Sequence, residues 1–288
     1  PPHHASSAAS DVYKRQGNPT VGALEARLTA LEDGAMCVAL SSGTSAVMYS
    51  LINIMSQGDN FISASQLYGG TYTMFDNILP EYGINAKKVD ITDFKAVEES
   101  IDDKTRAIYC ETITNPGLVV ADISALSEIA HSNGIPLIVD ATFTTSAIQK
   151  SFDFGADIVV YSLTKWMSGH GRVIAGAVIE KGGFDWGNGN FPLFDKPDTS
   201  YGGMRWGHDL GELSNVAYSL RLRTVPLRNL GANMSPDTAF EVMSGLETLA
   251  LRMERHCENA KQAAEYLDKH NLVAVSYTHL RAHETCEN

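Results

Sequence analysis

Short apolar runs alternate with helix-length segments along most of the chain. The apolar runs predict strands at 36–40, 60–64, 106–110, 137–139, 158–161 and 174–179. The segments between them predict helices at 21–31, 45–56, 72–82, 94–101 and 123–133. Strands that alternate with helices indicate the α/β class, with a mostly parallel sheet covered by helices on both faces.

The helix expected at 123–133 has both a start and a stop signal. Asp122 can cap its first turn, and Gly134 and Pro136 follow its last residue. After residue 179 the pattern changes to a stretch rich in glycine, proline and aspartate, KGGFDWGNGNFPLFDKPDTSYGG, which predicts a long surface excursion. One long amphipathic helix is then expected over 236–270.

Both ends of the chain resemble a sequencing artefact and not protein-coding sequence. A single short DNA sequence, read on its two strands, encodes both DVYKRQ at 11–16 and VSYTHL at 275–280, and the pair resembles translated sequencing-library adapter. We therefore expect residues 1–16 and 275–288 to be artefactual tails. The authentic part of the chain would lie between them.

Composition narrows the class of protein. The chain has 288 residues, of which 44% are apolar and 19% charged, as in an ordinary globular protein. Its net charge of −12 argues against nucleic acid as a partner. The four cysteines form no C-x-x-C pair, which speaks against a zinc site or a disulfide framework and fits a reducing cytoplasm. No apolar run approaches the length of a membrane span, and no signal peptide is visible.

The segment with the strongest chemical signal is YSLTKW, residues 161–166, at the end of an apolar strand. Open α/β sheets bind ligands at the carboxyl ends of their strands, so Lys165 is placed at the edge of a site. An amine there can form a Schiff base, while the hydroxyls of Ser162 and Thr164 bind a phosphate. An ordinary surface lysine is the alternative.

A second strand ends in a carboxylate. The run PLIVDATF, residues 136–143, places Asp140 where it can pair with a protonated pyridine nitrogen. Its alternative role is to cap a helix or form a turn. Together, Lys165 and Asp140 are the minimum set of protein groups that pyridoxal phosphate (PLP) requires.

Three further turns fit the same cofactor. The turn SSGTSA at 41–46 can direct backbone N–H groups at a phosphate, although many strand-to-helix turns have this composition. LYGGT at 67–71 presents Tyr68, whose ring either stacks on a planar ligand or packs under a loop. ETITNP at 111–116 offers Asn115 as a partner for a ring oxygen, or simply forms a turn.

These segments, in this order, resemble the Cys/Met-metabolism family of PLP enzymes, the cystathionine γ-synthase-like group. The resemblance covers almost all of 17–270, and the insertion GGFDWGNGNFPLFDKPDTSYGG is similar to that of the O-acetylhomoserine sulfhydrylases. It implies a fold type I, aspartate aminotransferase-like large domain at 17–235. Residues 236–274 would then be the connecting helix and the start of a truncated C-terminal domain.

The resemblance also implies roles for individual residues. Lys165 would form the Schiff base, Asp140 would pair with the ring nitrogen, and Tyr68 would stack on the ring and help to move protons. The other cofactor-binding residues that it implies are Ser42, Gly43, Thr44, Asn115, Thr142, Ser162 and Thr164. Of these, Asn115 would contact the ring oxygen, and Gly43, Thr44, Ser162 and Thr164 would hold the phosphate. No metal is implied.

A Tyr-x-Arg pair of the family reaches the phosphate of a neighbouring subunit. Tyr13 and Arg15 have that spacing before Asn18, but both lie inside the adapter-like segment, so homology and coincidence stay open. The family's substrate-carboxylate arginine lies in its C-terminal domain. Neither Arg221 nor Arg223 matches its position, and we therefore expect the chain to be a fragment.

By the same resemblance, the intact enzyme would exchange the acetoxy group on Cγ of O-acetyl-L-homoserine for sulfide or a thiol and release acetate, as a cytoplasmic homo-oligomer, a dimer of dimers. A cystathionine γ-synthase, a cystathionine or methionine γ-lyase, and a non-catalytic cofactor-binding fragment are the alternatives. Gly70 occupies a position where methionine γ-lyase-like members carry cysteine. His170 has either a structural or a site-lining role, and Cys37 and Cys110 should be buried, unreactive thiols.

Overall fold

The computed structural model describes residues 17–273, which are built around one mixed sheet. Its strands, in chain order, are β1 (Met36–Leu40), β2 (Asn60–Ala64), β3 (Asn85–Val89), β4 (Thr105–Glu111), β5 (Leu137–Asp140), β6 (Ile158–Tyr161) and β7 (Gly176–Glu180). Their order across the sheet is β1-β7-β6-β5-β4-β2-β3. Neighbours from β6 to β3 are parallel, whereas β7 is antiparallel to both β6 and β1. The α/β class and the mostly parallel sheet are confirmed.

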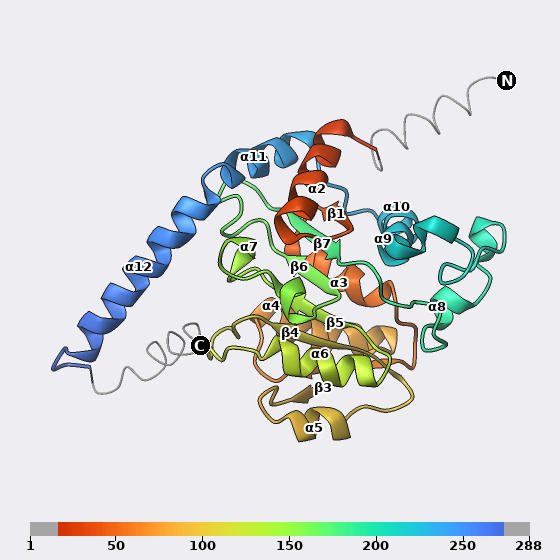
Figure 1. Ribbon diagram of the computed structural model, residues 1–288, viewed down its shortest axis with the longest axis horizontal. Coiled ribbons are helices and arrows are strands. Elements are labelled where there is room, and N and C mark those ends of the chain that lie inside the picture. The colour runs from red at the N-terminus through yellow and green to blue at the C-terminus, as the bar shows by residue number, and fades with distance from the viewer. Residues whose placement is uncertain (1–16, 274–288) are drawn as a thin grey trace.

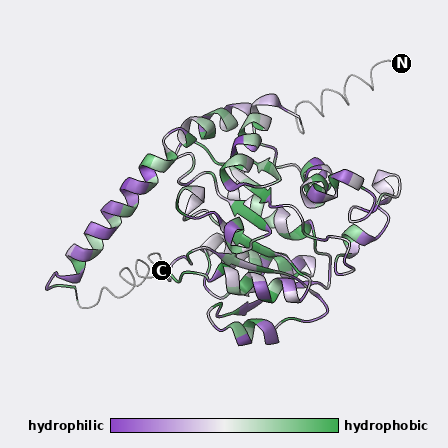
Figure 2. Ribbon diagram, in the orientation of Figure 1, coloured by the Kyte–Doolittle hydropathy of each residue, from purple (hydrophilic) through white to green (hydrophobic). Residues whose placement is uncertain are grey.

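Helices flank this sheet (Figure 1). They are α2 (Pro19–Glu32), α3 (Gly43–Ile52), α4 (Gly69–Thr73), α5 (Phe94–Glu99), α6 (Ile123–Ser132), α7 (Thr145–Ile148), α8 (Pro192–Asp195), α9 (Ala217–Leu222), α10 (Arg228–Leu230), α11 (Pro236–Leu246) and α12 (Leu249–Asp268). α3 packs against β6 and β7, and α6 against β4 and β5. The central strands of the sheet are strongly hydrophobic, whereas α12 alternates between hydrophobic and hydrophilic residues (Figure 2).

The predicted strands are all present, with small shifts at their ends, but β3 was missed. Its sequence, NAKKV, has two lysines and no apolar run. β3 lies at an edge of the sheet, where charged side chains can reach water and discourage further strand pairing. The start of α6 is confirmed in detail, because the Asp122 side chain accepts a hydrogen bond from the N–H of Ala125 (3.0 Å) and Gly134 adopts a positive φ of 65° after its end.

The single helix expected at 72–82 is wrong in detail. Instead α4 is followed by a π-helical segment, Met74–Ile78, and then by a 3₁₀ turn, Leu79–Tyr82. Pro80 has no N–H to donate and cannot continue a regular ladder of α-helical hydrogen bonds.

The long helix expected over 236–270 is also wrong, because it is two helices. α11 packs against α2, and the chain changes direction between Leu246 and Leu249. From there α12 runs away from the sheet (Figure 1). Sequence periodicity could not reveal the break, since both helices are amphipathic.

The glycine-rich stretch after β7 is only partly a surface excursion. Trp186, Phe191 and Phe194 within it are at most 2% exposed. The rings of Trp186 and Phe194 stack with centroids 5.1 Å apart, and the Trp186 indole N–H donates to Glu180 Oε1 on β7 (3.1 Å). The expectation failed because this aromatic cluster interrupts a stretch that otherwise has loop composition.

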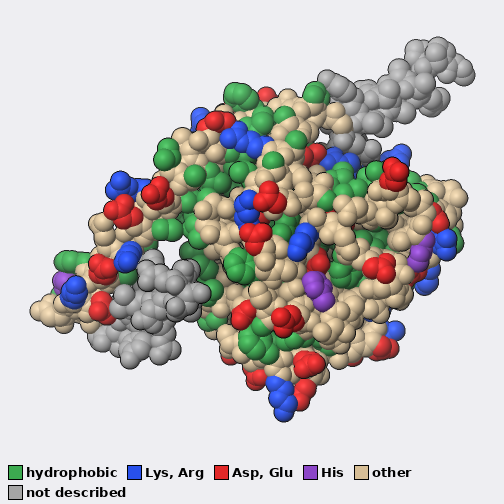
Figure 3. Space-filling model, viewed as in Figure 1, with side chains coloured by type: hydrophobic (Ala, Val, Ile, Leu, Met, Phe, Trp, Pro, Cys, Tyr) green, Lys and Arg blue, Asp and Glu red, His purple; other side chains and the backbone are tan. Residues whose placement is uncertain are grey.

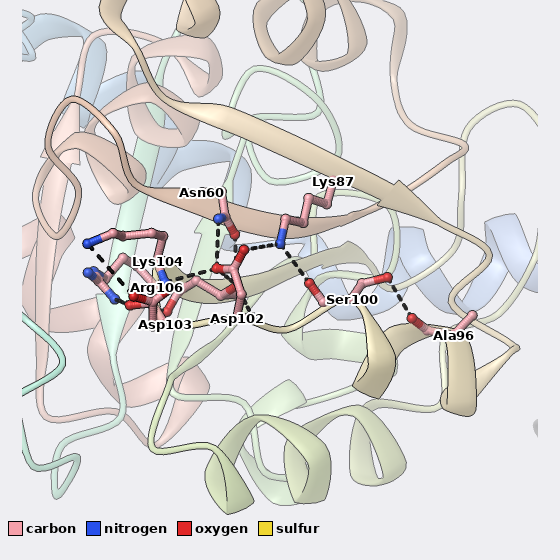
Figure 4. Close-up of polar contacts among 9 residues, drawn as sticks. Asn60, Lys87, Ala96, Ser100, Asp102, Asp103, Lys104 and Arg106 are labelled. Carbon is pink, nitrogen blue, oxygen red and sulfur yellow. Dashed lines mark hydrogen bonds and ion pairs between the residues drawn. The ribbon is translucent and has the colours of Figure 1, made fainter.

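A polar network ties together the amino ends of β2, β3 and β4 (Figure 4). Asp102 accepts hydrogen bonds from Lys87 Nζ (2.6 Å) and Asn60 Nδ2 (2.9 Å), and the same Lys87 amine donates to the Ser100 carbonyl (2.9 Å). Nearby, Arg106 pairs with Asp59 at 2.8 Å. These contacts hold the end of the sheet opposite to the carboxyl ends of the strands.

The surface carries both signs of charge. On the face seen in Figure 3, basic side chains lie singly among acidic ones and form no continuous basic patch. Within residues 17–273, no helix has the length and apolar character needed to cross a membrane.

Candidate active site

A cavity of about 720 Å³ opens at the carboxyl ends of the parallel strands, beside the first turn of α3. Most of the predicted site residues line it: Gly43, Thr44, Tyr68, Asn115, Asp140, Thr142, Ser162, Thr164 and Lys165. A smaller cavity of about 140 Å³, between α2 and Arg223, shares no residue with it. The structure thus brings together side chains from five separate segments of the chain.

Lys165 lies in the turn that follows β6. Its N–H donates to the Ser162 carbonyl (3.2 Å), and its own carbonyl accepts from the N–H of Gly169 (3.0 Å). The side chain enters the cavity, with Nζ 6.0 Å from the centre of the Tyr68 ring. The amine therefore faces the aromatic residue with which it was predicted to share a ligand.

Asp140 ends β5 with its carboxyl group in the same cavity. Oδ1 accepts from the N–H of Thr142 (2.9 Å), and Oδ2 accepts from the hydroxyl of Tyr109 (3.3 Å). Burial raises the pKa of Asp140, and the hydrogen bonds from Thr142 and Tyr109 oppose that shift. A cationic group facing this carboxyl would favour its ionised form.

The first turn of α3 packs against β6 and the turn that follows it. Gly43 packs so closely that a Cβ at this position would lie 2.5 Å from the Ser162 Cβ, so only glycine fits. Ser42, directly before this turn, does not line the cavity. Its hydroxyl instead caps α3 by accepting from the N–H of Ser45 (3.0 Å).

The three hydroxyl residues near Lys165 hold the neighbouring backbone. Thr142 Oγ1 accepts from the N–H of Ser162 (2.8 Å), which links the turns after β5 and β6. Thr164 Oγ1 accepts from the N–H of Ala175 (3.0 Å) and donates to its carbonyl (3.2 Å), which links the Lys165 turn to the chain that enters β7. All three line the cavity.

Glu111 is a site residue that the sequence analysis missed. It ends β4 with 6% of its surface exposed, and each carboxyl oxygen accepts one backbone N–H: Oε1 from Tyr68 (2.7 Å) and Oε2 from Asn115 (2.9 Å). Burial, followed by the negative charge of Asp140, raises the pKa of Glu111 to about 7. The available signal was an acidic residue at the end of an otherwise buried strand.

Other cavity residues came from segments with no predicted role. Phe143, Trp166 and Ile174 supply apolar surface, and Arg252 and His256 reach the cavity from α12. The Trp166 and His256 rings lie 4.7 Å apart. No pattern in the sequence connects α12 to a strand end, so this wall could not be predicted.

Several expectations concern residues away from the cavity. His170 does not line it, and its Nδ1 lies 2.6 Å from the Ser168 carbonyl oxygen within the same turn. Arg221 and Arg223 also lie elsewhere, where Arg223 pairs with Glu25 at 2.8 Å. Tyr13 and Arg15 fall outside the described residues.

The two strand cysteines are buried as expected. Burial raises the pKa of the Cys110 thiol to about 12 and that of Cys37 well above its ordinary value, so neither forms a thiolate readily. Across residues 17–273, histidine, cysteine and acidic side chains form no group of three or more that could hold a metal ion.

Comparison with known proteins places these features in a family. Residues 3–288 match the Cys/Met metabolism PLP-dependent enzyme family. The chain is 44% identical over 276 residues to the homocysteine synthase of Schizosaccharomyces pombe and 43% identical over 265 residues to the O-acetyl-L-homoserine sulfhydrylase of Leptospira meyeri. These matches cover 94% and 90% of this chain but only 64% and 60% of the relatives, so it spans less than two thirds of their length.

Solved structures agree with this match. An assigned O-acetylhomoserine (thiol)-lyase of Campylobacter jejuni, which contains a pyridoxyl-lysine monophosphate, superposes with a TM-score of 0.85 at 38% identity, over 90% of this chain and 63% of that one. The O-acetylhomoserine sulfhydrylase of Wolinella succinogenes gives 0.78 at 35% identity, over 88% and 70%. The large-domain fold expected from the resemblance is therefore confirmed, and the chain belongs to the Cys/Met metabolism PLP-dependent enzyme family.

Proposed function

We propose that the protein to which this chain belongs replaces the acetoxy group on Cγ of O-acetyl-L-homoserine with sulfide or a thiol, giving homocysteine or methionine plus acetate. The observation that carries the proposal is the convergence of Lys165, Asp140 and Tyr68 on one cavity. The names of the similar proteins support the choice of substrate.

The residues present fit the family's cofactor. A cavity of about 720 Å³ lies within the usual range for small-molecule sites. Gly43 has no Cβ and so allows the first turn of α3 to pack directly against Ser162, and a phosphate at this helix start would meet backbone N–H groups. Asp140 supplies the carboxylate for the ring nitrogen, and Tyr68 supplies an aromatic face for the ring.

When bound, PLP supplies an electron-accepting ring that stabilises negative charge at the substrate's Cα. Lys165 Nζ would hold the cofactor's aldehyde carbon and would accept a proton from the substrate's Cα. Asp140 would keep the proton on the ring nitrogen. Tyr68 would fix the plane of the ring, and Asn115 would donate to its phenolic oxygen.

Two other activities compete with this proposal. A cystathionine γ-lyase of Lactobacillus plantarum superposes with a TM-score of 0.73 at 32% identity, over 89% of this chain and 58% of that one. Elimination, as in a γ-lyase, and replacement by cysteine, as in a cystathionine γ-synthase, are therefore the alternatives. Gly70 argues against a methionine γ-lyase, because the resemblance places a cysteine at this position in that group. In this chain a Cβ at Gly70 would lie 2.8 Å from Tyr68 Cε1 and would displace the ring. A non-catalytic cofactor-binding chain is the third possibility.

We also propose that the protein forms a homo-oligomer, a dimer of dimers, and works in the cytoplasm. The thiols of Cys37 and Cys110 are buried and form no disulfide, in keeping with a reducing compartment. Analytical ultracentrifugation of the chain would test the assembly, and a single species with the mass of one chain would contradict it.

The test of the proposed function uses wild type, Lys165→Ala and, as a matched control, Lys95→Ala on the exposed face of α5. With PLP added, wild type and the Lys95 variant should show a visible absorption band that borohydride removes, and mass spectrometry should locate the reduced adduct on Lys165. The Lys165 variant should show neither.

Product analysis then separates the activities. Homocysteine formed from O-acetylhomoserine and sulfide supports the proposal, whereas cystathionine or an oxo acid favours the competitors. A band without any turnover favours the non-catalytic reading. An adduct on another lysine would refute the assignment of Lys165.

A further inference from the structure

We propose that Arg252, on α12, is a positioning residue that fixes the turn carrying Lys165 and so couples the C-terminal helix to the site. This inference rests on the proposed function, because it assigns importance to the position of Lys165. It concerns a residue that does not take part in the chemistry itself.

The Arg252 guanidinium binds both sides of a junction between two segments far apart in the sequence. Nη1 donates to the carbonyl of Trp166 (2.7 Å), the residue directly after Lys165, and Nη2 donates to that of Gly245 near the end of α11 (2.8 Å). Nη2 also lies 3.4 Å from the Met167 carbonyl oxygen. The planar guanidinium can make all these contacts at once, which a lysine amine cannot do with the same geometry.

A fourth contact fixes the guanidinium relative to its own helix. Nε donates to Oγ1 of Thr248 (3.1 Å), the residue just before α12. Arg252 is thus held at the break between α11 and α12, where its orientation does not depend on a flexible surface rotamer. The break described above is the feature that allows this side chain to face the Lys165 turn.

Two glycines show how closely the segments approach. A Cβ on Gly245 would lie 2.1 Å from the Ser168 carbonyl oxygen, a backbone atom that cannot move aside. A Cβ on Gly169, whose φ is +69°, would lie 2.5 Å from Arg252 Cζ. The Lys165 turn is therefore packed between α11 and the Arg252 guanidinium, with no space for either to shift alone.

The positive charge of Arg252 interacts with the dipoles of backbone carbonyl groups. Carbonyl groups at the end of a helical turn carry partial negative charge, and a cation beside them is stabilising. Burial lowers the pKa of Arg252, in agreement with a guanidinium that is partly withdrawn from water. Next to it, the contact between the Trp166 and His256 rings provides a second link between α12 and the same turn.

The consequence is reciprocal coupling between α12 and the Lys165 turn. A displacement of α12 would pull on the backbone at Trp166, and Lys165 would move with it. Conversely, a ligand that fixes Lys165 would hold α12 at its present angle. Arg252 acts here through Lys165 and needs no contact with the substrate.

The test compares Arg252→Ala and Arg252→Lys with Arg255→Ala, an exposed arginine one turn further on the same helix that pairs with Glu258 at 3.4 Å. The first readout is amide hydrogen exchange in the cofactor-free chain at Ser168 and Gly169, whose N–H groups donate to Leu163 and Lys165. We expect exchange to be about tenfold faster in Arg252→Ala, intermediate in Arg252→Lys and unchanged in Arg255→Ala.

The second readout is PLP binding. The dissociation constant for PLP should rise about tenfold in Arg252→Ala, with a slower borohydride-trapped reaction at Lys165, and should be unchanged in Arg255→Ala. If wild type does not bind PLP at Lys165, the proposed function fails, but the exchange measurement still decides the role of Arg252.

Equal exchange in Arg252→Ala and Arg255→Ala would overturn the inference. So would an increase of the same size in β5 and β6, because that would assign Arg252 to general stability. If Arg252→Ala does not fold, Arg252→Lys decides: faster exchange confined to residues 163–169 supports the inference, and wild-type exchange contradicts it.

Discussion

At the scale of single residues, Glu111 shows how one carboxyl group can align two parts of a site. Its two oxygens hold the backbones of Tyr68 and Asn115, which come from different turns and face the same cavity. With a pKa of about 7, this carboxyl changes charge near neutral pH in the cofactor-free chain. Loss of this carboxyl group would remove the acceptor of both N–H groups.

We predict that Glu111→Gln weakens PLP binding about tenfold, because an amide can accept only one of the two backbone hydrogen bonds. In wild type, affinity should rise as the pH increases through about 7 and Glu111 ionises, whereas the variant should show a much flatter profile. Titration of PLP absorbance between pH 6 and 8 measures both effects. Glu98→Gln, on the exposed side of α5, is the control, and the same profile in both variants would contradict the role of Glu111.

The residues that sequence reasoning found share one property: they are chemically distinctive side chains at strand ends. Lys165 and Asp140 follow apolar runs, so the topology alone brings them to one edge of the sheet. The role of Ser42 is difficult to assign from sequence, because capping and phosphate binding favour the same small hydroxyl residue at a helix start. Arg252 could not be found, since only the packed structure brings α12 to the turn after β6.

At the scale of elements, the edge strand β3 depends on polar contacts more than on apolar burial. Its Lys87 donates to Asp102 and to the Ser100 carbonyl, and Asp102 also binds Asn60 of β2. The hydrogen bond from Lys87, followed by that from Asn60, holds the pKa of Asp102 well below its ordinary value. Strand predictions from hydrophobic pattern fail at such an edge for this reason.

We predict that Asp102→Ala lowers the free energy of unfolding by about 1 kcal/mol at pH 7, a modest loss because both side chains of the Lys87 pair are partly exposed. The pKa of Asp102 is depressed on folding, so its contribution is fully present above about pH 4 and is lost as the pH falls further. Urea unfolding of wild type and variant at pH 7 and pH 3 checks this. A difference that is larger at pH 3 than at pH 7 would rule out the assigned charge effect.

At the scale of the whole molecule, buried carboxyl groups shape the response to pH. Glu32, on α2, accepts a hydrogen bond from the Tyr161 hydroxyl at the end of β6, and burial raises its pKa to about 7. Glu111 and Glu180 have pKa values raised to about the same level. The folded chain therefore retains protons that the unfolded chain releases between about pH 4.5 and 7.

Because these pKa values are raised on folding, the stability linked to them is complete below about pH 4.5 and decreases as the pH rises through 7. We predict that Glu32→Gln, which keeps an acceptor for Tyr161 but cannot ionise, reduces the loss of unfolding free energy between pH 5 and pH 8 by about 2 kcal/mol. Urea unfolding of the cofactor-free chain at both pH values provides the measurement. Parallel pH dependence of wild type and variant would show that Glu32 ionises normally.

The position of β1 has a consequence for how the protein is made. Among the strands of residues 17–273, β1 is synthesised first, yet its neighbour in the sheet is β7, which is synthesised last. Until residue 180 has been synthesised, the apolar strand 36–40 lacks the strand with which it pairs in the complete sheet. Unpaired strands of this kind promote association between chains. Nascent chains that stop before residue 176 should therefore depend on chaperones, while those that include β7 should be released from them.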